Sequence, residues 1–172
     1  MHEKDIKVAG FVSDSVVDGP GLRFALFVQG CQLSCEGCHN PQTQNFEGGT
    51  WMSIGELFAK IENNPLLDGV TLSGGEPLCQ AKQLLPLVQK IKDKDLHLAV
   101  YTGFVFEKLL EINNQDMLQL LQFVDVLIDG PFVQSLKSHD LKFKGSKNQR
   151  TIDVKQSLMQ KRVVLCEEEA WV

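Results

Sequence analysis

The chain alternates short apolar runs with longer stretches in which apolar residues recur every three or four positions. A short apolar run bounded by turn-forming residues is typical of a buried strand, whereas the spacing of three and four is typical of a helix with one buried face. The pattern predicts four such strands and a possible fifth: 24–28, 70–73, 96–101, 124–128 and 162–166.

The intervening segments read as helices. Ser53 and Glu56 have the spacing of a capping box and predict the start of a helix. The apolar stripe of this helix consists of Ile54, Leu57, Phe58 and Ile61, and the helix is expected to end at 63–65. A second stripe runs from Leu84 to Ile91, where Pro86 fits only if the helix begins within a turn of it. A third helix is predicted to start at Phe106, to break near 113–114 and to resume over 117–121.

Strands alternating with helices indicate a parallel sheet with right-handed crossovers. A closed eight-stranded barrel of this kind takes about 250 residues, more than the 172 present. We therefore predict an α/β fold, an open partial (β/α) barrel of about five or six mostly parallel strands, as a single domain over residues 1–172. Its site is expected in the loops at the carboxyl ends of the strands, with one side left open for a large substrate.

Composition narrows the possible functions. The net charge of −5 argues against general nucleic-acid binding, and no apolar stretch approaches the 18 residues of a membrane span. The lysine- and arginine-rich segment 137–162 is interpreted as a solvated face, with a docking role as the alternative. An odd number of cysteines, five, and a charged start at 1–7 without a secretory signal favour a reducing compartment, the cytoplasm.

Cys31, Cys35 and Cys38 follow the first predicted strand within eight residues. A structural zinc site and an all-cysteine cubane cluster each need four ligands, so a trio suggests a [4Fe-4S] cluster with one iron free for another ligand. The glycines and proline at 30, 37 and 41 disfavour a helix with the cysteines on its buried face. A zinc module with Cys79 or His39 as the fourth ligand remains an alternative on this evidence.

A second motif, Ser73-Gly74-Gly75-Glu76-Pro77, lies at the carboxyl end of the strand that follows. Two adjacent glycines allow a close backbone approach to a ligand. A tight turn alone would explain them, but this turn is expected at the same end of the sheet as the cysteines, one βα unit later.

The spacing C-x3-C-x2-C and the Gly-Gly-Glu-Pro segment resemble those of radical S-adenosylmethionine (SAM) enzymes. Within them the chain is most similar to activating enzymes of glycyl radical proteins, and among these to the anaerobic ribonucleoside-triphosphate reductase activating proteins. The segments that carry this resemblance span most of the chain: 18–23, 30–40, 72–77, 101–103, 129–132 and 144–150. Gly37 stands where related enzymes commonly have an aromatic residue, and Lys144 where they often have arginine.

The resemblance implies a cofactor site as well as a fold, the radical SAM core. Cys31, Cys35 and Cys38 would bind the [4Fe-4S] cluster. Gly75, with Gly74 and Glu76, would lie against the SAM amino group, and the backbone from Gly37 through Cys38 to His39 would contact adenine. Tyr101 and Thr102, with Gly103, would line the ribose or methionyl pocket.

The implied reaction is reductive cleavage of SAM to methionine and a 5'-deoxyadenosyl radical, which generates a glycyl radical on the large subunit of the reductase. The implied partners are that subunit and a low-potential electron donor such as a flavodoxin-like protein. Cys79 and Cys166 are predicted to be structural, and Phe46 and Trp51 to cover the cluster or touch a partner.

Two other functions stay open. One is a radical SAM enzyme acting on a small molecule, similar to the carboxydeazaguanine synthases, or an activator of another glycyl radical enzyme. The other is a zinc-stabilised binding module without catalysis.

Overall fold

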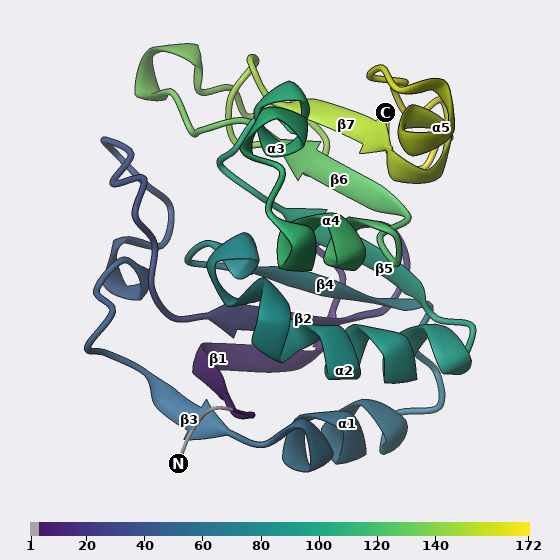
Figure 1. Cartoon of the computed structure of the whole chain (residues 1–172). Coiled ribbons are helices and arrows are strands. Elements are labelled where there is room, and N and C mark those ends of the chain that lie inside the picture. The colour runs from purple at the N-terminus through teal and green to yellow at the C-terminus, as the bar shows by residue number, and fades with distance from the viewer. Residues whose placement is uncertain (1–3) are drawn as a thin grey trace.

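The computed structural model describes residues 4–172 and shows a single sheet with helices packed against it (Figure 1). The strands are β1 (Ile6–Ser15), β2 (Arg23–Val28), β3 (Thr50–Met52), β4 (Gly69–Gly74), β5 (His97–Tyr101), β6 (Val126–Asp129) and β7 (Arg150–Asp153). The α-helices are α1 (Ile54–Glu62), α2 (Ala81–Asp93), α3 (Phe106–Ile112), α4 (Gln115–Leu121) and α5 (Val154–Gln160). Short 3-10 helices cover Pro41–Thr43, Pro77–Gln80 and Gln134–Leu136.

The strand order is β3-β1-β2-β4-β5-β6-β7, and the sheet is open. The four central strands, β2, β4, β5 and β6, are parallel, whereas β1, β3 and β7 join antiparallel at the two edges. The predicted open α/β architecture with a parallel centre is confirmed. The sheet has seven strands rather than about five or six, because both edges carry strands that the apolar pattern did not reveal.

The edge strands explain two differences from the prediction. β1 pairs with β2 through two irregularities of register, so its buried positions do not alternate regularly, and its sequence lacks a clear strand period. The predicted strand over 162–166 is wrong: that segment makes one isolated bridge, Leu165 to Ile152, before the chain turns back into the core. The edge is formed instead by β7, directly before α5.

Local signals placed the other elements well. Ser53 and Glu56 form the predicted capping box of α1, and Asn113, in the left-handed conformation, separates α3 from α4. The expectation that the second helix begins within a turn of Pro86 is wrong, because α2 begins at Ala81, more than a turn earlier. The helix accommodates the proline because only one hydrogen bond is lost, to the carbonyl of Lys82, and Lys82 is exposed to water.

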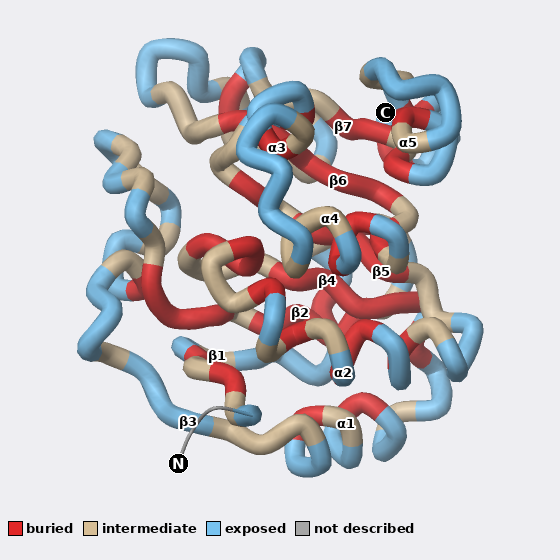
Figure 2. The backbone as a smooth tube through the Cα atoms, viewed as in Figure 1, coloured by how far each residue is buried: buried red, intermediate tan, exposed pale blue. Residues whose placement is uncertain are grey.

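The main core lies between the sheet and helices α1 to α4, which cover the same face of it (Figure 1). Figure 2 shows the central strands buried along nearly their whole length. No helix in residues 4–172 combines the length and apolar character needed to cross a membrane.

A smaller apolar cluster occupies the other face of the sheet, where Trp171, near the C-terminus, is 1% exposed. The Arg23 guanidinium lies 5.6 Å from the centre of this ring and donates to Thr71 Oγ1 (2.7 Å) and to the Val70 carbonyl (2.9 Å). Arg23 and His97 begin their strands, so the cluster reaches the end of the sheet opposite the predicted site, while Tyr101 and Phe143 pack against it from the other end.

Candidate functional site

A cavity of about 770 Å³ opens at the carboxyl ends of the central strands. This volume is within the range of small-molecule sites, roughly 300–1,000 Å³. The cavity wall contains most of the residues predicted from the sequence: Cys31, Cys35, Cys38, His39, Gly74, Gly75, Glu76, Tyr101, Thr102 and Gly103. Two motifs separated by more than 30 residues of chain therefore meet at one site.

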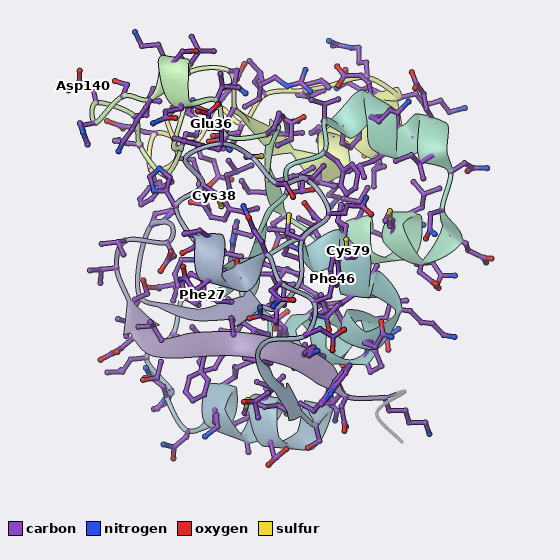
Figure 3. All side chains as sticks on the ribbon, turned by 90° about the vertical axis from the view of Figure 1, so that its left-hand side faces the viewer. Phe27, Glu36, Cys38, Phe46, Cys79 and Asp140 are labelled. Atoms are coloured by element: carbon purple, nitrogen blue, oxygen red, sulfur yellow. The ribbon has the colours of Figure 1, made fainter. Side chains whose placement is uncertain are left out.

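The cysteine loop, residues 30–40, is attached to the segment that follows it. The Gly30 amide donates to the Thr43 carbonyl (2.7 Å), and the Cys31 amide donates to the Gln44 carbonyl (3.0 Å). All three cysteines are free thiols of intermediate exposure. In Figure 3, which looks onto this side of the molecule, Cys38 and Glu36 lie on the loop and Phe27 lies below them near the end of β2.

The Gly74-Gly75 turn packs directly against the start of the cysteine loop. The Gly75 amide donates to the Val28 carbonyl (2.8 Å), and the Glu76 amide donates to the Gly30 carbonyl (2.9 Å). A Cβ atom on Gly75 would lie 2.3 Å from the Gly30 oxygen. The backbones can approach this closely only because residue 75 has no side chain.

Glu76 joins this turn to the end of β5. Its side chain, 1% exposed, accepts from Thr102 Oγ1 (2.9 Å), from the Gly103 amide (2.8 Å) and from the Leu78 amide (3.1 Å). Burial raises the pKa of Glu76 to about 7, although the three hydrogen bonds act in the opposite direction. Glu76 is therefore a crosslink between β4 and β5 whose side chain is already fully engaged.

The third connection comes from the cysteine loop itself. A Cβ atom on Gly103 would lie 2.1 Å from Leu33 Cδ1, so the Leu33 side chain fills the space above Gly103. The loop, the Gly-Gly turn and the end of β5 thus form one packed unit around the cavity.

The donor set suits a cubane cluster. Within residues 4–172, no three His, Cys, Asp or Glu side chains converge as they would on a single metal ion. A cubane makes a different demand, because each cysteine binds a different iron at its own corner of the cluster. Three free thiols on one loop that borders one cavity fit a cluster with one iron left for another ligand.

The thiols must lose their protons to bind iron. Burial is the main cause that raises the pKa of Cys31, and the nearby Glu76 carboxylate adds to it. Because a bound metal replaces the proton of each thiol, loading the site releases protons and is favoured at higher pH.

Neither remaining cysteine lies on the cavity wall. Cys79 is half-buried behind the Gly-Gly turn, where burial, reinforced by Glu76 and Cys31, raises the pKa of its thiol to about 11. Cys166 is buried beside Trp171 on the far cluster. His39 is exposed and packs edge-on against Phe132, with 4.8 Å between ring centres.

Among the residues predicted to bind the cluster or SAM, Gly37 is the one that lies off the cavity wall; a Cβ on it would meet the side chain of Gln134. Phe46 packs over Gly30, immediately before the first cysteine, while Trp51 lies on β3 beneath Lys7.

The remaining wall comes from residues to which the sequence interpretation gave no role. Val16 and Val17, between β1 and β2, line one side of the cavity, and Phe132, Phe143 and Lys144 line another. The Tyr101 hydroxyl donates to the Phe143 carbonyl (2.7 Å), and burial raises its pKa. The two valines are 67% and 75% exposed. The sequence signal that could have predicted their place on the cavity wall is an apolar pair directly before the Asp-Gly-Pro-Gly segment.

The chain is also similar to known proteins. Residues 17–152 match the family described as 4Fe-4S single cluster domain, a range that contains every predicted site residue. The anaerobic ribonucleoside-triphosphate reductase-activating protein of Haemophilus influenzae is 38% identical over 146 residues, which cover 78% of this chain and 89% of that protein. The protein of the same name from Enterobacteria phage T4 is 37% identical and covered to 85% of its length, across 78% of this chain.

Two further similarities are more partial. The pyruvate formate-lyase-activating enzyme of Clostridium pasteurianum is 38% identical over 72% of this chain and 55% of that enzyme. The crystal structure of QueE from Escherichia coli matches 58% of this chain and 53% of that chain, with a TM-score of 0.48 and 18% identity. The chain carries the 4Fe-4S single cluster domain and belongs to the family of anaerobic ribonucleoside-triphosphate reductase-activating proteins.

Proposed function

We propose that this chain activates an anaerobic ribonucleoside-triphosphate reductase by generating a glycyl radical on its large subunit, through reductive cleavage of SAM at a [4Fe-4S] cluster. The observation that carries the proposal is that three free thiols of one loop and the Gly-Gly turn after β4 border the same cavity. The relatives that share this sequence over most of its length are named for that activity.

In this proposal Cys31, Cys35 and Cys38 hold the cluster as thiolates. When bound, the cluster supplies one electron to the SAM sulfonium, and cleavage to methionine and a 5'-deoxyadenosyl radical allows hydrogen abstraction from a glycine of the reductase. The protein contributes ligation, orientation and exclusion of water from this reaction.

The Gly-Gly turn would hold the methionyl end of SAM. Gly74 and Gly75 expose backbone to the cavity, and the Gly75 carbonyl is proposed to accept from the SAM amino group. Glu76 lies beside that contact and keeps the turn in place through its bonds to Thr102 and Gly103.

The other cavity residues would hold the nucleoside. Tyr101 and Thr102 are proposed to line the ribose or methionyl pocket, at the end of β5. Cys38 and His39 lie on the cavity wall and are proposed to contact adenine, whereas Gly37 lies off the wall against Gln134.

The setting of the reaction is part of the proposal. Residues 1–172 act as a single radical SAM domain, supported by one continuous sheet from β3 to β7. A low-potential donor such as a flavodoxin-like protein supplies the electron. A cytoplasmic location agrees with five cysteines that are all free thiols.

Activation of the reductase tests the proposal directly. Anaerobically reconstituted and reduced protein, incubated with SAM and the reductase large subunit, is expected to yield a glycyl-radical doublet by electron paramagnetic resonance. Cys35→Ala should abolish cluster binding and SAM cleavage, because only two thiols remain on the loop. Cys166→Ala, on the far face of the sheet, should retain both and is the matched control.

The same preparations separate the alternatives. SAM cleavage without a radical on this reductase would favour a small-molecule substrate or another glycyl radical enzyme. Zinc without iron and sulfide in anaerobically purified protein would contradict the enzyme.

A further inference from the structure

A short arm, residues 137–147, projects from the connection between β6 and β7 beside the cysteine loop. Its base is closed by an antiparallel bridge between Lys137 and Ser146 and by a hydrogen bond from the Lys147 amide to the Leu136 carbonyl (2.9 Å). Phe132, just before the arm, packs against His39 of the cysteine loop. In Figure 3, Asp140 on the arm and Glu36 on the cysteine loop lie at the same end of the molecule.

The arm is positively charged in a chain whose net charge is −5. It carries four lysines against one carboxylate, Asp140: Lys137, Lys142, Lys144 and Lys147. Within residues 4–172 none of the four forms an ion pair. Lys142 donates to the Glu169 backbone carbonyl (3.1 Å), which leaves its charge in place. The cysteine loop adds one carboxylate, Glu36, and the C-terminal segment brings Glu169 beside Lys142, so this surface carries four lysines against three carboxylates.

Three of these lysines lie outside the cavity wall. Lys144 lines it, whereas Lys137, Lys142 and Lys147 are exposed and take no part in its wall. The wall has a different, apolar character at Val12, Val16 and Val17, which are all exposed. A protein that inserts a segment toward bound SAM meets this apolar part, so the lysines outside the cavity are available to a second partner.

Resting on the proposed function, which needs an electron at the cysteine loop, we propose that Lys137, Lys142 and Lys147 dock an acidic one-electron donor protein. One electron passes from the reduced cofactor of the donor to the cluster held by the three cysteines, so the donor is oxidised and the cluster reduced by one electron each. Encounters between redox proteins bury little surface, and complementary charge then governs how fast the partners meet.

Charge reversal tests this docking. The arm variant is Lys137→Glu/Lys142→Glu/Lys147→Glu, and the matched control is Lys82→Glu/Lys90→Glu/Lys155→Glu, which makes the same change in net charge on exposed lysines of α2 and α5. Stopped-flow absorbance follows cluster reduction by a purified acidic flavodoxin in its hydroquinone form. Binding of oxidised flavodoxin to the cluster-free chain gives a second readout.

The arm variant is expected to be reduced about tenfold or more slowly than wild type at low ionic strength, with a matching loss of flavodoxin binding, and high salt should remove the difference. The control should stay near wild type in both measurements. A variant with glutamine at the same three positions should have a reduction rate between those of wild type and the charge-reversed variant. It replaces the charge-reversed variant in these measurements if that chain does not fold. Equal effects of the arm and control variants would overturn the docking.

Chemical reduction distinguishes the remaining outcomes. Reduced by dithionite, the arm variant should form the glycyl radical as well as wild type does. If it does not, the arm docks the reductase rather than the donor, and the inference is wrong. If chemically reduced wild type itself yields no glycyl radical, the proposed function fails instead.

Discussion

Glu76 is a buried carboxyl group that accepts hydrogen bonds from three donors around one turn. Its burial makes the stability of the fold depend on pH. Its pKa in the folded chain, about 7, lies above its ordinary value of 4.5 because burial disfavours the charged form. The folded state therefore binds this proton more tightly than the unfolded state does. Stability from this group is fully present below about pH 4.5 and is lost as the pH rises toward 7.

This predicts a pH dependence that Glu76→Gln removes. Between about pH 5 and pH 8, the free energy of unfolding of the cluster-free wild type should fall relative to that of the variant, by up to about 3 kcal/mol. Urea unfolding of both proteins across this range measures the difference. A constant difference at every pH would show that Glu76 titrates normally.

The same variant also has an effect that does not depend on pH. Glutamine places an amide donor where the carboxylate accepts from Thr102 or from the Gly103 amide, so at least one buried donor loses its acceptor. A loss of this kind costs roughly 1–3 kcal/mol. Leu33 of the cysteine loop packs against Gly103, so a shift of Gly103 should disturb the loop. The iron content after reconstitution should therefore fall as well.

At the scale of elements, the site depends on how closely the end of β4 approaches the end of β2. The parallel register brings Gly74 opposite Val28, and the turn that follows places Gly75 against Gly30. The strand ends thus fix the distance between the Gly-Gly turn and the first cysteine through backbone contacts.

Gly75→Ala should disturb this approach. The added Cβ would lie 2.3 Å from the Gly30 oxygen, and backbone atoms on both sides must move apart. We expect a loss of about 1–3 kcal/mol in the free energy of unfolding, as for other overpacked buried sites, together with reduced SAM binding. Urea unfolding and isothermal titration with SAM check the two effects.

Gly55→Ala is the matched control. Gly55 lies in α1, and the nearest atom to its added Cβ would be Ser53 Oγ at 4.0 Å. Alanine is the better helix former, so this variant should gain about 0.5–1 kcal/mol and bind SAM normally. Similar losses in the two variants would contradict the role assigned to the turn.

Across the whole molecule, the two ends of the parallel strands have different roles. Their carboxyl ends carry the cavity, while their amino ends are closed by Arg23, His97 and Trp171. Arg23 is buried without a carboxylate within hydrogen-bond distance among residues 4–172, and burial lowers its pKa to about 10. The Trp171 ring and the surrounding carbonyls are its main neighbours, so the C-terminal segment completes the core.

Trp171→Ala should therefore destabilise the chain while leaving the three cysteines able to hold the cluster, even though the Trp171 ring also packs edge-on against Phe143 of the cavity wall, with 5.5 Å between ring centres. Large buried aromatic side chains cost about 3–5 kcal/mol when truncated to alanine, and the urea midpoint should fall accordingly. The iron content of the folded fraction should remain that of wild type. Trp51→Ala, at a position 41% exposed, should cost much less, and equal losses would contradict the closing role of Trp171.

Features whose signals are local could be predicted from the amino-acid sequence. The cysteine spacing, the Gly-Gly turn, the capping box of α1 and the interruption at Asn113-Asn114 each depend on a few consecutive residues, and the structure has the predicted elements there. Apolar runs likewise located β2, β4, β5 and β6, because strands buried on both faces need continuous apolar sequence.

The structural features that depend on contacts between distant segments could not be predicted from the sequence. The antiparallel strands β1, β3 and β7 near the two edges exist through pairing with their neighbours, since such half-exposed strands carry no clear period. Leu33 on Gly103, the cavity wall at Phe143 and the burial of Trp171 against Arg23 join parts of the chain from 70 to nearly 150 residues apart. Such contacts form only when the whole sheet is assembled, because no short segment carries the shape of the surface that it will meet.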